Sequence, residues 1–170
     1  MGKAPRLLAK PQETQTQKTP EYRILGRTGI KVSAVGYGAS RTLEPSLVKG
    51  ALETGINFFD TAEGYNNGVS EQIVGKALAD RRDKAVIASK ISPNHTAPAE
   101  LRGYCEAALK RMQIDYVDVY MIHWPIRTHS VAGTFEVLQQ LKDEGVPYKK
   151  GVYTFRSNGR AMALDRTDGG

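Results

Sequence analysis

The sequence predicts an α/β fold in which about four and a half β/α units follow one another along the chain. Apolar runs such as INFFD, AVIAS and YVDVYMIH are nearly continuous, which is typical of strands buried on both faces of a parallel sheet. Between these runs lie segments with one apolar stripe at helical spacing, such as the segment with Leu101, Cys105, Ala108 and Met112. Strand and helix therefore alternate, and this periodicity fits an open doubly wound sheet as well as a barrel.

A small β-hairpin is expected before this series begins. The segment EYRILGRTGIKVS has short apolar runs on either side of Gly-Arg-Thr-Gly. That pattern predicts two strands, at residues 22–25 and 30–33, around a turn. Residues 1–20 are rich in Lys, Gln, Thr and Pro and have no periodicity, so we expect a flexible leader there.

The alternating units follow from residue 34 onward. The strands are expected at residues 34–38, 57–60, 85–90, 117–122 and, as the start of a fifth, 151–155. The helices are expected at residues 45–54, 70–79, 98–111 and 131–144. Pro45 suits a first helical turn, Gly55 suits the end of that helix, and Ser70 suits an N-cap. Residues 156–170 show no strand or helix pattern that continues the series.

The composition is that of a globular domain without a membrane span. The chain has 170 residues, of which 40% are hydrophobic, so it can bury a core, and no apolar run approaches the roughly 20 residues of a spanning helix. Its net charge of +6 comes from the two ends, because residues 21–146 hold 15 basic and 15 acidic residues. A nucleic-acid-binding domain would carry a basic stripe on its folded body, so no specific nucleic-acid partner is expected.

Cysteine and histidine usage narrows the setting further. The single Cys105 cannot form an internal disulfide, which favours a reducing, cytoplasmic location. No Cys/His cluster has the spacing of metal ligands, so no metal site is expected.

Four residues that can do chemistry lie at or just past predicted strands. They are Asp60, Tyr65, Lys90 and His123. Because the carboxyl ends of parallel strands meet at one edge, we expect the four side chains to share one rim. Tyrosine ionises near pH 10, roughly, which is too high for an efficient acid at neutral pH, but a nearby ammonium lowers that pKa. Tyr65 would then donate a proton, an Asp60–Lys90 pair would tune it, and His123 would orient a carbonyl oxygen or relay the proton.

Each of the four also has a structural alternative. Capping is as common a role as catalysis for a residue like Asp60, and a structural ion pair is the usual role of a lysine like Lys90. A cover for the rim is the alternative for Tyr65, and a satisfied core histidine is the alternative for His123. Their shared placement at strand ends, rather than any one of them, favours an active site.

Four segments of the chain resemble the aldo-keto reductases. They are YRILGRTGIKVSAVGYG, INFFDTAEGYNNGVSEQIVGKAL, VIASKIS and LKRMQIDYVDVYMIHWP. The second and fourth are highly specific, and the order and spacing of all four match the family. The resemblance implies the N-terminal portion of a (β/α)8 TIM barrel whose bottom is plugged by an N-terminal β-hairpin. It divides the chain into a flexible leader at 1–20, an incomplete aldo-keto reductase barrel at 21–155 and a non-family tail at 156–170.

The resemblance also implies an activity. Members of the family reduce an aldehyde or ketone to an alcohol by hydride transfer from NADPH, with a tyrosine, here Tyr65, as the general acid. The positions of the family's catalytic tetrad correspond to Asp60, Tyr65, Lys90 and His123. The positions beside the cofactor correspond to Gly38, Ala39, Ser40 and, again, Asp60.

The chain departs from the family after the fourth helix. There the family has a strand that ends in a Ser-Asn pair, which holds the carboxamide of the nicotinamide, whereas Tyr153 and Thr154 occupy those positions here. The groups that hold the 2′-phosphate of NADPH are also expected to be absent, because nothing in residues 156–170 replaces them. We therefore expect this chain to be weakly active or inactive.

Two other functions stay open at this point. One is a non-catalytic binding or regulatory module on the same scaffold, and the other is a half barrel that is completed by homodimerisation. An incomplete barrel has open sheet edges, which favour self-association. The sequence does not identify the carbonyl substrate.

Overall fold

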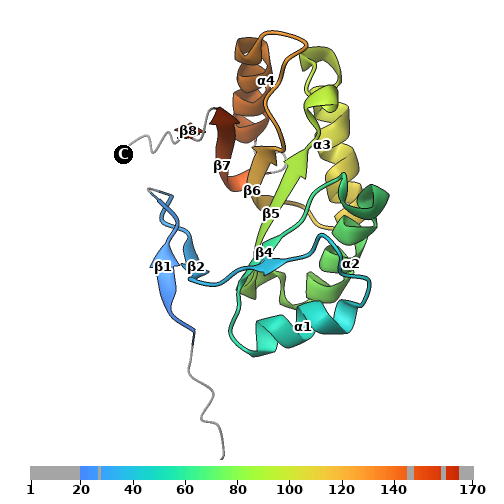
Figure 1. Cartoon of the computed structure of the whole chain (residues 1–170), viewed down its shortest axis with the longest axis vertical. Helices are drawn as coiled ribbons and strands as arrows, with labels where there is room; N and C mark the ends of the chain where they lie inside the picture. Colours follow the sequence, from blue (N-terminus) through green and yellow to red (C-terminus); the bar gives the residue numbers. More distant parts are fainter. Residues whose placement is uncertain (1–19, 27, 145–147, 158–159, 165–170) are drawn as a thin grey trace, which may run out of the picture.

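The computed structural model describes residues 20–26, 28–144, 148–157 and 160–164, the last two stretches as backbone strands. Strands and helices alternate along most of this length (Figure 1). The strands are β1 (Tyr22–Ile24), β2 (Lys31–Ser33), β3 (Tyr37–Gly38), β4 (Phe58–Asp60), β5 (Val86–Ile91), β6 (Val117–Ile122), β7 (Tyr148–Ser157) and β8 (Arg160–Leu164). The α-helices are α1 (Pro45–Glu53), α2 (Val69–Leu78), α3 (Pro98–Met112) and α4 (Val131–Asp143). The short 3-10 helices are η1 (Tyr65–Gly68), η2 (Ala79–Lys84) and η3 (Pro93–His95).

Strands β3 to β8 form one six-stranded sheet in the order β3-β4-β5-β6-β7-β8. Neighbours from β3 to β7 are parallel, and β8 is antiparallel to β7. One α-helix connects each successive pair of parallel strands. In Figure 1 the four helices lie along one side of the sheet, and the β1–β2 hairpin lies away from them. The predicted α/β series with its N-terminal hairpin is confirmed, and it forms a partial set of the units of a (β/α) barrel.

The sheet buries apolar side chains on both faces. Ile87 of β5 belongs to a buried cluster that includes Leu101 of α3. Its chain neighbours Val86 and Ala88 belong to a second cluster with Val32 of the hairpin. Because successive side chains of a strand point to opposite faces, these two clusters explain why the strand is a continuous apolar run in the sequence.

Most element boundaries agree with the sequence-based expectation to within a few residues. Pro45 begins α1, and Gly55 follows its end with a left-handed φ of 92°. β6 spans the expected residues 117–122. β3 is shorter than the expected 34–38, because the N–H of Ala34 bonds to the carbonyl of Glu21 and so extends the hairpin instead of the sheet.

The expected helix cap at Ser70 is wrong. Gly68 occupies the N-cap position of α2 with a φ of 84°, and α2 begins at Val69. Ser70 lies inside the first turn and is fully buried. The helix begins early because a glycine can adopt the left-handed entry conformation, and the hydroxyl of Ser70 binds groups from other loops.

Residues 156–170 were expected to show no strand or helix pattern that continues the β/α series, and the strand described at residues 160–164 is antiparallel and does not follow a helix. Residues 160–164 form β8, which pairs with β7 from Ser157↔Arg160 to Tyr153↔Leu164. Strand formation depends strongly on a neighbouring strand, and β7 provides one that the local pattern does not show. Most of the expected leader, residues 1–19, lies outside the described residues. Within the part of the chain that the structure describes, no helix is long and apolar enough to cross a membrane.

Candidate active site

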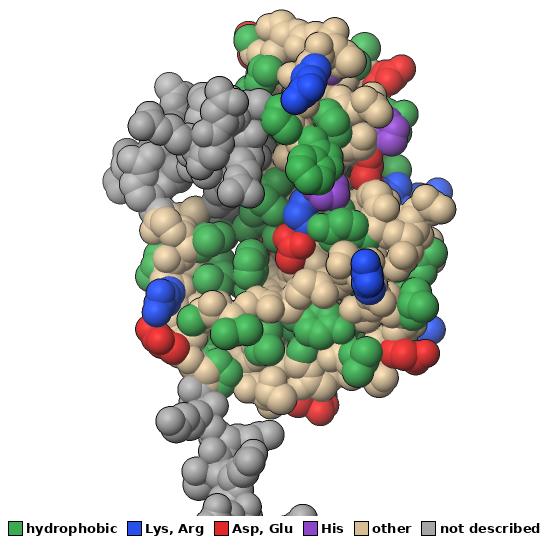
Figure 2. All heavy atoms as spheres, viewed as in Figure 1, with side chains coloured by type: hydrophobic (Ala, Val, Ile, Leu, Met, Phe, Trp, Pro, Cys, Tyr) green, Lys and Arg blue, Asp and Glu red, His purple; other side chains and the backbone are tan. Residues whose placement is uncertain are grey.

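The four predicted residues lie together at the carboxyl edge of the sheet. Asp60 is the last residue of β4, Lys90 is the second-last residue of β5, and His123 directly follows β6. Tyr65 begins η1, in the loop between β4 and α2. The parallel pairing of β4, β5 and β6 brings these ends to the same edge. In Figure 2 an acidic, a basic and a histidine side chain adjoin one another in the middle of the face shown, among apolar and uncharged atoms.

The ammonium of Lys90 connects the members of this cluster. It donates hydrogen bonds to Oδ1 of Asp60 at 2.5 Å, to the carbonyl oxygen of Thr61 at 2.8 Å and to the phenolic oxygen of Tyr65 at 3.1 Å. An ammonium has three donors, and these contacts use all of them. The side chain of Lys90 is 13% exposed and that of Asp60 is 31% exposed, so the carboxylate compensates a charge that water reaches poorly.

The phenolic O–H of Tyr65 is available to donate a hydrogen bond to a ligand. Because an ammonium can only donate, the Tyr65 oxygen is the acceptor in its bond with Lys90, and the Tyr65 O–H is not used by that bond. The Tyr65 ring lies edge-on to the imidazole of His123, with ring centroids 5.4 Å apart and an angle of 80° between the planes. The O–H can therefore donate to a ligand atom beside these two rings.

The imidazole of His123 is favoured in its neutral form. Burial lowers the pKa of His123 from its ordinary value of 6.5, and the Lys90 ammonium lowers it further. The carboxylates of Asp60 and Glu63 oppose this shift. His123 also stacks on Trp124, with ring centroids 5.5 Å apart and an angle of 13°. A neutral imidazole has one donor and one acceptor nitrogen, and it can orient a polar ligand without repelling Lys90.

The backbone after Tyr65 has an uncommon conformation. Asn66, Asn67 and Gly68 have φ values of 50°, 53° and 84°, in the left-handed region that Asn and Gly tolerate best. This turn brings the chain directly from Tyr65 into α2. The place of Tyr65 therefore depends on the conformation of this backbone turn as well as on its contact with Lys90.

Ser70 connects the loop after β3 to the loop after β4. Its hydroxyl donates to the carbonyl of Ala39 at 2.8 Å and lies 2.8 Å from Oγ1 of Thr61. The N–H of Ala39 donates in turn to the carbonyl of Asp60 at 2.8 Å. Ser70, Ala39 and Thr61 are all fully buried. The residue expected to cap a helix thus holds two loops of the rim together.

The residues expected beside a cofactor lie at this same edge. Gly38 pairs in register with Asp60, and Ala39 is bound to β4 by its backbone. Ser40 is exposed, and its carbonyl accepts a hydrogen bond of 3.4 Å from the side chain of Asn66. A Cβ placed on Gly38 would meet nothing within 4 Å, so the space beside this backbone is open to a ligand.

Two buried carboxylates near the site were not predicted. Glu63 lies in the loop between Asp60 and Tyr65, and its side chain is 8% exposed. Glu71 is fully buried in α2 and accepts hydrogen bonds of 2.6 Å from Oγ of Ser89 and from Nε of Arg111. Burial raises the pKa of Glu71, and Ser89 and Arg111 oppose that shift.

The sequence does hold a signal for Glu71. In α2 it lies at helical spacing from the buried residues Val74 and Leu78. Its place on the buried face could thus have been read from periodicity, although its acidic character suggests exposure.

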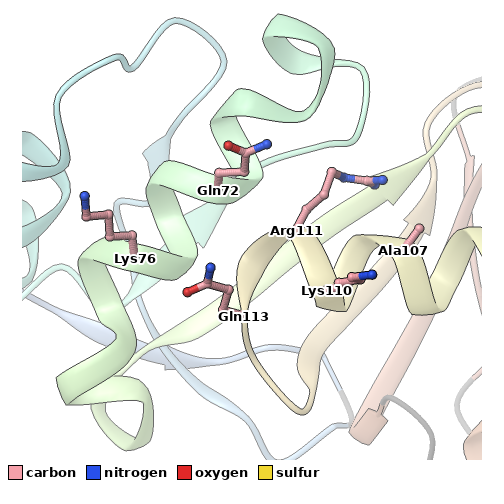
Figure 3. Close-up of a pocket in the computed structure, with 6 residues that line it drawn as sticks. All are labelled: Gln72, Lys76, Ala107, Lys110, Arg111 and Gln113. Carbon is pink, nitrogen blue, oxygen red and sulfur yellow. The ribbon is translucent and has the colours of Figure 1, made fainter.

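A cavity of about 480 Å³ lies elsewhere, between α2 and α3 (Figure 3). It is lined by Gln72, Lys76, Ala107, Lys110, Arg111 and Gln113. In Figure 3 the side chain of Lys76 extends away from those of Lys110 and Arg111, so the three cationic groups do not converge. None of the four rim residues lines it, so it is separate from the candidate site. Among the described residues, no group of three or more His, Cys, Asp and Glu side chains could hold a metal ion.

Comparison with known proteins gives one matching family and several relatives. A model of the aldo/keto reductase family matches residues 37–156. The aldo-keto reductase YhdN of Bacillus subtilis (strain 168) is 33% identical over 156 residues, which cover 79% of this chain and 47% of that protein. A protein of Oryza sativa subsp. japonica, named "probable voltage-gated potassium channel subunit beta", is 34% identical over 154 residues, 78% of this chain and 46% of that protein.

A solved structure gives the same result for the fold. An aldo/keto reductase from Klebsiella pneumoniae, in complex with NADP and acetate, superimposes with a TM-score of 0.67 at 31% identity, over 75% of this chain and 46% of that one. The chain spans about half the length of the curated relatives it matches. Because the family match at residues 37–156 covers well over half of the 170 residues, the chain belongs to the aldo/keto reductase family.

Proposed function

We propose that the chain carries the catalytic residues of an NADPH-dependent reductase that converts a small aldehyde or ketone to an alcohol. The observation that carries this proposal is the ammonium of Lys90, which is hydrogen-bonded to both Asp60 and the phenol of Tyr65 at the strand-end edge. Family membership and the NADP complex of a structural relative support the choice of cofactor. The single cysteine, Cys105, is buried and supports a cytoplasmic location.

Each residue of the cluster has a distinct role in this proposal. Bound NADPH supplies the hydride for the carbonyl carbon. Tyr65 donates its free proton to the carbonyl oxygen as that oxygen gains negative charge. Lys90 stabilises the phenolate that remains, and Asp60 holds Lys90 in place. His123 orients the carbonyl oxygen, and the exposed Trp124 beside it offers an apolar wall to the substrate.

The cofactor would lie against the loop of residues 38–40 and beside Asp60. The open space at the Cβ position of Gly38 supports this placement. Tyr153 and Thr154, which replace the family's Ser-Asn pair, lie in β7, and their side chains are outside the described residues. The loss of that carboxamide contact, and the lack of a 2′-phosphate site in this chain, stay predictions.

We further propose that the 170-residue chain by itself has weak turnover or none. A (β/α)8 barrel binds its ligands with loops from many of its strands, and the chain spans about half the length of its relatives. Hydride transfer needs both reactants held in one geometry. A cofactor held by half of the loops would reach that geometry rarely.

An assay of NADPH oxidation with a reactive aldehyde tests both proposals. The chain is compared with Tyr65→Phe and with the control Tyr104→Phe, which lies in α3 and stacks on His95 instead. We expect slow oxidation at most, and any oxidation should disappear in Tyr65→Phe alone. Substantial turnover that Tyr65→Phe abolishes would support the catalytic assignment and contradict the weak activity.

A hybrid protein tests the catalytic assignment even if the 170-residue chain by itself is inactive. Residues 37–156 replace the matching stretch of the full-length Bacillus subtilis relative. In an active hybrid, Tyr65→Phe is expected to lower kcat by roughly 10²–10⁴-fold, because it removes the general acid. Tyr104→Phe should leave kcat near that of the hybrid. A hybrid whose kcat is indifferent to Tyr65→Phe would show that the assignment is wrong.

A regulatory or binding module is the second candidate. The specific observation in its favour is the 34% identical relative whose name is that of a channel subunit. A pure binding module has no need of all four polar rim residues, which argues mildly against it. It would bind NADPH in the hybrid, with unchanged affinity in Tyr65→Phe and with no turnover in either form.

Self-association is proposed as a further property of the chain. Within the described residues β3 is an edge strand of the six-stranded sheet, and open edges pair readily with other chains. A discrete dimer with cooperative melting, measured by size-exclusion chromatography and calorimetry, would support a half barrel completed by a second copy. A polydisperse aggregate would support non-specific edge pairing instead.

A further inference from the structure

Glu63 binds the loop that carries Tyr65 to the end of the strand that carries Lys90. Its N–H donates a hydrogen bond of 3.1 Å to the carbonyl of Lys90. Its Oε1 accepts a hydrogen bond of 2.8 Å from the N–H of Ser92, two residues beyond Lys90. Backbone and side chain of one residue thus hold the two segments together, from a position between Asp60 and Tyr65.

The same carboxylate oxygen is also fixed from the side of α3. It lies 2.6 Å from Nδ1 of His95 in η3. The ring of His95 stacks on Tyr104 of α3, with centroids 3.9 Å apart and an angle of 5° between the planes. The side chain of Glu63 is 8% exposed, so its contacts are largely shielded from water. Glu63 therefore has direct partners in β5, at the N-cap of η3 and in η3 itself, all outside its own loop.

The loop between β4 and α2, which carries Tyr65, has a turn followed by residues with positive φ values. The N–H of Tyr65 bonds to the carbonyl of Ala62 at 3.1 Å, and Glu63 lies within that turn. Immediately after the turn, Asn66 and Asn67 have positive φ values. Positive φ at two successive residues other than glycine has an energetic cost, and Glu63 provides side-chain contacts at the start of this stretch.

We propose that Glu63 is a positioning residue that holds the ring of Tyr65 against Lys90 and His123. Glu63 acts through the loop and touches none of the reacting groups. A role of Glu63 in catalysis rests on the proposed function. The position of the Tyr65 ring, in contrast, can be measured without turnover. The competing explanation is that the contacts of Glu63 with Ser92 and His95 only stabilise the fold as a whole.

Proton NMR of the His123 ring gives a signature that separates these explanations. Because the rings of Tyr65 and His123 lie 5.4 Å apart and nearly perpendicular, the ring current of Tyr65 shifts the carbon-bound ring protons of His123. Tyr65→Leu provides the value without that ring. The chain has three histidines, and His123→Gln assigns the His123 signal by its loss. Spectra are recorded where His123 is neutral, so that changes in protonation do not contribute.

The expected result is specific to Glu63. In Glu63→Ala the His123 signal should move most of the way to its value in Tyr65→Leu. Glu63→Gln keeps an acceptor oxygen for Ser92 and should retain most of the original shift. The control Glu106→Gln, at an exposed position of α3, should leave the signal unchanged. Hydrogen exchange in Glu63→Ala should accelerate in residues 61–68 and 91–97 and not in β6.

An unshifted His123 signal in Glu63→Ala would overturn the proposal, whatever the exchange rates. If Glu63→Ala does not fold, His95→Phe decides, because it removes the contact to Glu63 and keeps an aromatic ring over Tyr104. A His123 signal that moves toward the Tyr65→Leu value in this variant supports the proposal, and an unshifted signal overturns it. Neither measurement uses NADPH or a substrate, so a failed reductase assay leaves this test intact.

Discussion

Nζ of Lys90 lies 2.5 Å from Oδ1 of Asp60, so the cation that contacts the Tyr65 phenol is itself held by a carboxylate. Lys90→Met would leave Asp60, 31% exposed, without its counter-charge and the Thr61 carbonyl without its donor. Loss of a hydrogen bond to a charged partner at a largely buried position costs about 1–3 kcal/mol. We expect a decrease of that size in the free energy of unfolding, measured with urea.

The control for Lys90→Met is an exposed ion pair. Arg23 and Glu21 form one in which the side chains are 68% and 69% exposed, and such pairs contribute little. Arg23→Met should leave the urea midpoint nearly unchanged. A double-mutant cycle with Asp60→Asn should give a coupling of about 0.5–3 kcal/mol for the Lys90 pair. A coupling indistinguishable from zero would contradict the contact.

The lowered pKa of His123 predicts a dependence of stability on pH. The unfolded chain takes up a proton at His123 near pH 6.5, and the native state resists this because of burial and the Lys90 ammonium. The stability from neutral His123 is therefore fully present above about pH 6.5 and is lost as the pH falls through the lower native pKa. Urea unfolding between pH 7.5 and 5, roughly, should show a smaller loss in His123→Gln than in the unmodified chain.

The single tryptophan reports the pKa of His123 directly. Trp124 stacks on His123, and a protonated imidazole in contact with an indole quenches its emission. Fluorescence should fall with a midpoint below pH 6.5, and the transition should be absent in His123→Gln. Lys90→Met removes a positive charge, so the midpoint should rise. A midpoint in Lys90→Met at or below that of the unmodified chain would rule out this electrostatic account.

The sequence was sufficient for the features that depend on local pattern. Continuous apolar runs marked β5 and β6, because a strand covered on both faces has few polar positions. The meeting of Asp60 and Lys90 followed from parallel strands alone, since their carboxyl ends share an edge. Their 2.5 Å contact therefore needed no knowledge of the rest of the fold.

The features that were missed depend on residues far apart in the sequence. The hydroxyl of Ser70 binds Ala39, 31 residues away, instead of capping its own helix. Glu71 is buried against Arg111, which belongs to α3 and lies 40 residues away in the sequence. β8 exists as a partner of β7, and an isolated pattern does not show that pairing. In each case a tertiary partner overrides the local preference of the residue.

At Gly75 the backbone of α2 approaches that of α3 so closely that no side chain fits between them. A Cβ at Gly75 would lie 1.9 Å from the carbonyl oxygen of Met112, which is backbone and cannot rotate away. Gly75→Ala should therefore push the helices apart and lower the free energy of unfolding by about 1–3 kcal/mol or more. Gly50 in α1 is the matched control, because a Cβ there meets nothing within 4 Å. Gly50→Ala should raise stability by about 0.4–1 kcal/mol, and equal effects of the two substitutions would contradict the close approach.

The burial of Glu71 predicts a dependence of stability on pH of opposite sign to that of His123. Burial raises the pKa of Glu71 above 4.5, so the native state holds this proton more tightly than the unfolded chain. Its contribution to stability is therefore full below about pH 4.5 and is lost as the pH rises through the native value. Glu71→Gln should remove that part of the slope in urea unfolding while an oxygen remains to accept from Ser89.

Arg111→Met tests whether the guanidinium of Arg111 compensates the cost of burying the Glu71 carboxylate at neutral pH. Removal of one partner of a buried pair leaves an uncompensated charge and costs about 3–5 kcal/mol, and the 27% exposure of Arg111 places the expected loss near the lower figure. Arg102→Met is the control, because its pair with Glu144 is 42% and 49% exposed. The double variant Arg111→Met with Glu71→Gln should recover part of the loss, since no charge is then left buried. Equal losses in Arg111→Met and Arg102→Met would mean that Glu71 is already neutral when paired, and that the proton rather than the guanidinium compensates its burial.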